Sequence, residues 1–147
     1  MSLLVPYDGS SLSTAALRRA REFADYSDAD LVVLTLIPDD PEYATERGWL
    51  EDEDTFDVGV IERKLRQRVH DDAPNAEFRC ELIENVDPVA SVTLDVVRRI
   101  REVANEESAE ILFVGSENAG RVASPLTSVG SPLSEDPQYD VHIVRHP

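Results

Sequence analysis

Three continuous or nearly continuous apolar runs constrain the fold of this chain more than any other feature of its sequence. They cover residues 3–6 (LLVP), 31–37 (LVVLTLI) and 111–114 (ILFV). A strand that is apolar on both faces has to be covered on both faces, which is typical of interior strands in a parallel sheet flanked by helices. Residues 77–84 and 139–145 instead alternate apolar and polar side chains, which is typical of half-exposed edge strands.

Helical spacing of apolar residues fills the intervals between these runs. The pattern predicts a first helix capped by Ser10 or Ser11. The expected buried face of this helix consists of Leu12, Ala16, Ala20 and Phe23. A second helix is expected to start near Phe56 and to bury Val60, Ile61, Leu65 and Val69. A third is expected to bury Val89, Val92, Val96, Ile100 and Val103. The acidic, aperiodic residues 39–57 are predicted to form a long loop, and a short last helix is expected from Ser131 to about Pro137.

This order of elements predicts a single α/β domain over residues 1–147, with a doubly wound sheet of five parallel strands. With right-handed crossovers, the strand order 3-2-1-4-5 satisfies the interior and edge patterns, and we predict it. The topological switch point then lies between the first and fourth strands, and ligands of open α/β sheets bind there, at the carboxyl ends. The loops at that point read PYDGSS and GSENAGR.

The composition is strongly acidic, with 30 Asp and Glu against 14 Lys and Arg and a net charge of −16. This balance argues against nucleic acid and against anionic membranes as partners. The acidic residues are spread along the chain, which favours adaptation to a cytoplasm at high salt, where charges are screened within about 3 Å at 1 M; an acidic interaction protein is the alternative. With no membrane-length apolar run and no signal peptide, a cytoplasmic location is expected.

The opening LLVPYDGSSLSTAALRRA, the run LVVLTLIP, the turn ENVDPVASV and the segment ILFVGS…GRVASPLTSVGS together resemble the universal stress protein family. The resemblance covers nearly the whole chain except residues 39–57, and the acidic composition indicates a divergent member of haloarchaeal type. It implies a Rossmann-like fold of the adenine nucleotide alpha hydrolase type and a cytoplasmic homodimer. In many members it also implies ATP or AMP binding at the switch point.

The nucleotide-binding branch of that family carries a G-x-x-G-x9-G-(S/T) pattern, and this chain matches only its second half. Gly120, nine residues, Gly130 and Ser131 fit, whereas Gly115 lies five residues before Gly120 instead of three. Pro132 removes one backbone N–H, and Glu135 and Asp136 would repel phosphate. The loop is therefore either a phosphate nest or a connection with a Ser cap that was kept after binding was lost.

The resemblance assigns Pro6 and Leu36 to an adenine pocket, where simple packing at a strand end is the alternative. Asp8 is expected on a ribose hydroxyl, or on a cation through phosphate, with a local turn as the alternative. The phosphates would lie over Gly115, Gly120, Arg121, Gly130 and Ser131. The function expected is a regulatory module of the stress response that binds ATP, with Mg²⁺, or AMP; the alternative is a nucleotide-free dimeric interaction module.

Enzyme chemistry finds little support in the motifs. The chain contains no G-x-x-x-x-G-K-[ST] and no G-x-S-x-G, and its three histidines lack metal-ligand spacing, so we expect no metal site and at most slow ATP hydrolysis. Tyr43 and Trp49 are expected either to form a lid over a pocket or to anchor their loop. Val141 and Ile143 would pair the last strand with its two-fold mate in a homodimer; the sequence leaves any other protein partner open.

Overall fold

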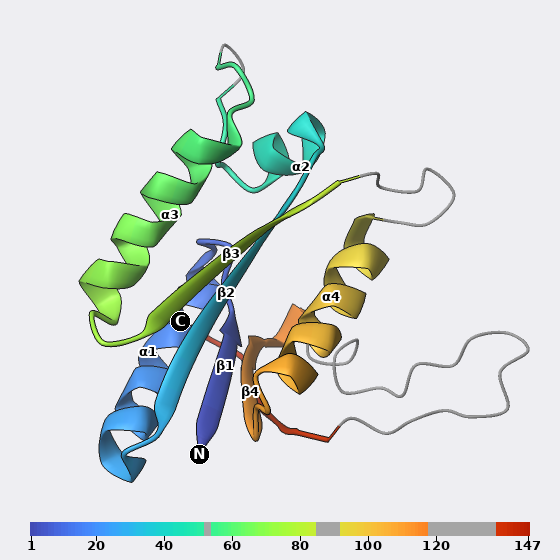
Figure 1. The fold of residues 1–147 in the computed structure, drawn as a ribbon. Helices are drawn as coiled ribbons and strands as arrows, with labels where there is room; N and C mark the ends of the chain where they lie inside the picture. Colours follow the sequence, from blue (N-terminus) through green and yellow to red (C-terminus); the bar gives the residue numbers. More distant parts are fainter. Residues whose placement is uncertain (52–53, 85–91, 118–137) are drawn as a thin grey trace, which may run out of the picture.

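The computed structural model describes residues 1–51, 54–84, 92–117 and 138–147, and its strands form one parallel five-stranded sheet. In chain order the strands are β1 (Ser2–Pro6), β2 (Asp30–Pro38), β3 (Glu77–Ile83), β4 (Ile111–Gly115) and β5 (Asp140–Val144). Their order in the sheet is β3-β2-β1-β4-β5 (Figure 1). The predicted α/β class, strand order and interior positions of the three apolar runs are therefore confirmed.

Helices cover both faces of this sheet, as the continuous apolar strands require. α1 (Ser11–Ser27) and α3 (Val58–Asp72) pack on one face, and α4 (Val92–Glu106) packs on the other (Figure 1). In β1, Leu3 and Val5 belong to the core beneath α1 and α3, whereas Leu4 belongs to the core beneath α4. None of the helices in the described ranges combines the length and apolar character that crossing a bilayer requires.

The buried face of α1 differs from the predicted one. Ser10 caps the helix by accepting a hydrogen bond from the Ser13 backbone N–H, as one of the two expected caps. The stripe on the core consists of Ser13, Ala15, Ala16, Leu17, Ala20 and Ala24. Leu12 is only half-buried and Phe23 is 38% exposed. The polar Ser13 can join this stripe because its hydroxyl donates a hydrogen bond to the Ser10 carbonyl, and the stripe therefore centres closer to Leu17.

The prediction of a long loop over residues 39–57 is wrong in part, because this stretch contains the short helix α2 (Pro41–Glu46). The Asp40 side chain caps it by accepting from the backbone N–H groups of Glu42 and Tyr43, and Pro41 suits the first helical turn. α3 then begins at Val58, capped by Asp57, two residues after the predicted start. Val89 and the predicted last helix lie outside the described residues.

The two strands predicted at the edges, β3 and β5, lie at the edges of the sheet, but the burial of their side chains alternates only in part. In β3, Cys80 packs against the core, and burial raises the pKa of its thiol to about 11, whereas Leu82 is 40% exposed. In β5, Val141 packs against the core beneath α4 and Ile143 is 41% exposed.

On the α4 side of β3, arginines and glutamates form a network of ion pairs. Arg99 Nε lies 2.7 Å from Glu81 Oε1, and Arg79 Nη2 lies 2.6 Å from Glu106 Oε2. The hydrogen bond from Arg99 is the main cause that lowers the pKa of Glu81. Because these groups are only partly buried, the network contributes little more than surface pairs do.

Replacing Glu81 by glutamine is expected to lower the free energy of unfolding near pH 7 by about 1 kcal/mol, since two arginines lose a charged partner. A carboxyl whose pKa is lowered by folding stabilises the protein above its unfolded pKa of about 4.3 and loses that contribution as the pH falls further. The gap between wild type and variant should therefore close in acid. Urea unfolding across pH measures it, with Glu22→Gln on exposed α1 surface as the control; a gap that does not depend on pH would contradict the assignment.

Candidate functional site

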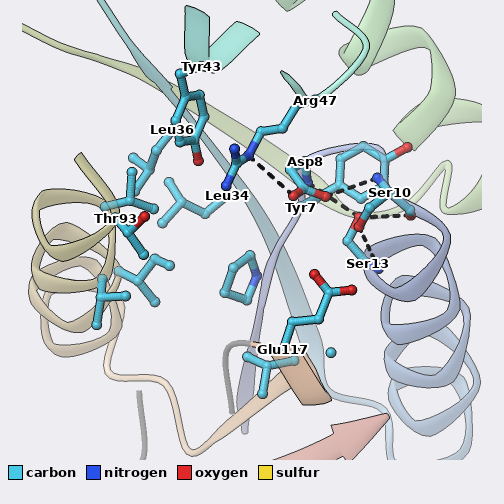
Figure 2. A pocket seen from close by; sticks show the side chains of 16 residues that line it. Tyr7, Asp8, Ser10, Ser13, Leu34, Leu36, Tyr43, Arg47, Thr93 and Glu117 are labelled. Carbon is cyan, nitrogen blue, oxygen red and sulfur yellow. Dashed lines mark hydrogen bonds and ion pairs between the residues drawn. The ribbon is translucent and has the colours of Figure 1, made fainter. Parts of the chain in front are cut away.

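A cleft opens at the carboxyl ends of the central strands, at the switch point between β1 and β4. The amino ends of α1 and α4 and the short helix α2 lie at this end of the sheet (Figure 1), and side chains from all three line the cleft (Figure 2). Its lining consists of Pro6, Tyr7, Asp8, Ser10, Ser13, Leu34, Leu36, Tyr43, Arg47, Thr93, Val96, Val97, Ile100, Val114, Gly115 and Glu117. Four of the eight predicted site residues, Pro6, Asp8, Leu36 and Gly115, thus line one cleft. The other four, Gly120, Arg121, Gly130 and Ser131, lie outside the described residues.

One wall of the cleft is apolar. It is built from Pro6, Leu34 and Leu36 at the strand ends, Val96, Val97 and Ile100 of α4, and Val114 of β4. These residues come from both sides of the switch point, so the strand order itself assembles the wall. An apolar wall beside a few fixed polar groups is the usual composition of a small-molecule site.

Asp8 stands at the polar end of the cleft, in the turn between β1 and α1. Its Oδ1 accepts a hydrogen bond from the Ser10 backbone N–H at 2.9 Å, which closes a local turn. Gly9 between them has a φ of +83°, a left-handed conformation that favours glycine. Asp8 thus makes the contact with local backbone that the turn alternative predicts. About a third of its side chain, 31%, stays exposed.

Arg47, the residue that follows α2, also faces the cleft, and no pattern in the sequence indicates this. Its Nε lies 3.6 Å from Asp8 Oδ2, and its guanidinium carbon lies 3.5 Å from the centroid of the Tyr43 ring (Figure 2). Asp40 followed by Pro41 is a cap signal that would have indicated α2. No local pattern relates an arginine in that segment to an aspartate 39 positions earlier.

Tyr43 and Trp49 make the contacts expected of anchors. Their ring centroids are 5.7 Å apart, and each side chain is less than a tenth exposed, at 8% and 9%. The Trp49 indole N–H donates to the Asp8 carbonyl at 2.7 Å, which ties the α2 segment to the end of β1. Burial raises the pKa of Tyr43 to about 12, so its ring is neutral where Arg47 packs on it.

Gly115 is the last residue of β4 and lies on the lining of the cleft. The absence of a side chain at this position has a packing reason. A Cβ atom at this position would lie 2.9 Å from the Cβ of Leu12, which belongs to the first turn of α1. Only glycine lets the helix approach the strand this closely. The end of β4 therefore requires glycine whether or not the following loop binds phosphate.

The charged side chains on the described lining are Asp8, Glu117 and Arg47. The Glu117 carboxylate points into the cleft from just after β4 (Figure 2). In the described ranges, no group of three or more His, Cys, Asp or Glu side chains is placed to hold a metal ion. His142 stacks on Phe113, with ring centroids 4.8 Å apart.

Comparison with solved structures shows where this fold occurs. A universal stress protein in complex with cAMP is 24% identical, with a TM-score of 0.54 over 100% of this chain and 98% of that one. UspA from Lactobacillus plantarum is 18% identical, with a TM-score of 0.57 over 99% and 97% of the two chains. A universal stress protein family member from Burkholderia pseudomallei is 20% identical, with a TM-score of 0.53 over 97% and 94%. At these identities the likeness is one of fold.

No curated protein matches the chain significantly. The sequence model of the universal stress protein family, however, matches residues 1–145, which is nearly the whole chain. That match agrees with the strand order and with the position of the cleft at the switch point. The chain therefore belongs to the universal stress protein family.

Proposed function

We propose that this protein is a regulatory module of the stress response that binds an adenine nucleotide in the cleft. Adenine packs against Pro6 and Leu36, and the ribose lies on Asp8. The phosphates lie over Gly115, Gly120, Gly130 and Ser131, with Arg121 as a charged contact. The observation that carries the proposal is the apolar wall beside Asp8 at the switch point. Such a wall suits a flat aromatic ring, and a carboxylate suits a sugar hydroxyl.

Two further facts support the choice of ligand. The family match spans residues 1–145, and a structural relative was solved in complex with cAMP. ATP, with Mg²⁺, and AMP are the ligands proposed. Asp8 and Glu117 are the carboxylates of the described lining, and either can accompany phosphate oxygens around Mg²⁺, which binds proteins through one or two carboxylates.

The proposed active form is a homodimer joined through β5. Among the described strands β5 pairs only with β4, and the 41% exposure of Ile143 leaves an apolar side chain on that edge. A two-fold mate pairing along the edge would cover it. Light scattering should report a dimer for the wild type and a monomer for Ile143→Glu. We also propose that the protein is adapted to high salt and is of haloarchaeal type. Its cytoplasmic location stays a prediction.

Calorimetry and analysis of released nucleotide on protein purified in molar KCl test the binding. Denaturation should release an adenine nucleotide, or the stripped protein should bind ATP with Mg²⁺, or AMP, in the micromolar range. An absence of released nucleotide together with an absence of heat at millimolar ATP and AMP would rule the proposal out. GTP serves as the matched ligand control, because a pocket selective for adenine discriminates between the two bases.

A nucleotide-free interaction module of the same fold is the second candidate, and the charge of the cleft favours it. The described lining carries two carboxylates, Asp8 and Glu117, and one arginine, so acidic side chains outnumber basic ones. In the sequence, Glu135 and Asp136 follow the glycine loop. Such a surface repels a triphosphate. In that case the dimer persists in light scattering, while calorimetry detects no nucleotide.

A further inference from the structure

Arg47 is the basic side chain on the described lining of the cleft, and its contacts with the described residues do not use its full bonding capacity. An arginine carries five N–H donors in a rigid fork. The Nε of Arg47 is buried and has no hydrogen-bond partner among the described residues, and its ion pair with Asp8 is long, at 3.6 Å. In the same molecule, Arg99 Nε approaches Glu81 to 2.7 Å. A buried donor left in this way costs stability unless a ligand or solvent satisfies it.

The position of Arg47 is fixed before any ligand arrives. Its guanidinium packs over the Tyr43 ring, Tyr43 packs against Trp49, and the Trp49 indole N–H is bonded to the Asp8 carbonyl. Cation–π contact of this kind is strongest when the cation is partly desolvated, and only 28% of the Arg47 side chain is exposed. A cation held in this way binds an anion without the entropy loss of ordering a long side chain.

The neighbouring charges define what kind of group Arg47 would bind. Asp8 accepts hydrogen bonds and repels anions, whereas the Arg47 guanidinium donates to oxyanions, phosphate above all. Glu117 also faces the cleft, so Arg47 is the group of the described lining that attracts an anion. A hydroxyl and a phosphate carried by one sugar would match this adjacent pair of side chains.

We propose that Arg47 determines ligand specificity by binding a phosphate oxygen of a ribonucleotide while Asp8 accepts a hydrogen bond from a free hydroxyl of its ribose. The inference rests on the proposed function and adds to it the residue that distinguishes a nucleotide from a nucleoside. The phosphate is carried either on the 5′ oxygen or on the 3′ oxygen of the ribose. Both present the same oxyanion to a guanidinium, and the two isomers of AMP separate them.

The experiment compares adenosine, 5′-AMP and 3′-AMP by calorimetry on three variants. Arg47→Met removes the charge and keeps an apolar stem, and Arg47→Lys keeps the charge without the fork. Arg66→Met is the matched control: Arg66 packs over Phe78 at 4.8 Å on α3, outside the cleft lining, and its loss changes the net charge equally. Arg47→Met should lower the affinity for one AMP isomer by about tenfold or more relative to the affinity for adenosine. Arg47→Lys should lower that affinity less, and Arg66→Met should leave all three affinities unchanged.

The isomer that weakens identifies the phosphate that Arg47 binds. Equal weakening of adenosine and of both isomers would show that Arg47 merely supports the α2 segment, and the inference would be wrong. An unchanged preference for nucleotide over adenosine in Arg47→Met would also overturn it, while leaving the proposed function intact. A wild-type protein that binds none of the three ligands, nor ATP, removes the inference and the proposed function together.

Discussion

Replacing Phe113 by alanine is expected to lower the free energy of unfolding by about 3–5 kcal/mol. Phe113 lies in β4, is 1% exposed, and packs between the rings of Phe23 and His142. The substitution removes the aromatic contacts and leaves a cavity between the sheet and α1 that the surrounding side chains fill only in part. Denaturant unfolding of wild type and variant, at one fixed KCl concentration, measures the difference.

Tyr26→Ala is the matched control, because Tyr26 is an aromatic residue of α1 that is 92% exposed. It should change the free energy of unfolding by no more than about 0.5 kcal/mol. A loss below about 1 kcal/mol for Phe113→Ala would mean that the packing of α1 on β4 described above is wrong. Since a domain of this size has only about 5–15 kcal/mol in total, the full loss would bring the variant close to unfolding.

Replacing Asp8 by alanine is expected to weaken nucleotide binding by about 10- to 100-fold. A hydrogen bond to a charged group contributes about 1.5–3 kcal/mol, and each 1.4 kcal/mol is a factor of about ten in affinity. The Asp8 carboxylate lies on the cleft lining with 31% of its side chain exposed, so a ribose hydroxyl can reach it. A calorimetric titration with AMP measures the loss of affinity.

Asp8→Asn separates the two roles of this side chain. It keeps an oxygen that can accept from the Ser10 N–H, so the turn before α1 is preserved, while the charge is lost. We expect an affinity between those of the wild type and Asp8→Ala. Asp25→Ala, on an exposed position of α1, controls for the change in net charge. Full affinity in Asp8→Ala would remove Asp8 from the site.

The position of the cleft could be predicted because it follows from topology. The continuous runs at 3–6, 31–37 and 111–114 identified the interior strands, and the alternation at 77–84 and 139–145 identified the edges. The order 3-2-1-4-5 with right-handed crossovers satisfies those two patterns, and that order fixes the switch point. Pro6, Asp8, Leu36 and Gly115 then meet because each lies at or near the carboxyl end of a central strand.

The contribution of α2 could not be predicted, because it depends on contacts between distant parts of the chain. The hydrogen bond from Trp49 to Asp8 joins residues 41 positions apart, and the ion pair from Arg47 ends at the same aspartate. Periodicity reports which face of an element is buried, but not where a side chain of a connecting segment points. α2 itself is only six residues long and has no apolar period, so the cap signal of Asp40 before Pro41 is the one local indication of it.

Amide hydrogen exchange with and without saturating AMP tests the central claim most directly, because it reports both binding and its location. The account predicts slower exchange in residues 7–13 and 93–97, which border the cleft at the amino ends of α1 and α4. It predicts unchanged exchange in residues 28–30 and 73–76, which lie at the opposite ends of the strands. Protection confined to that opposite end, or no protection at saturating AMP, would contradict a nucleotide site at the switch point.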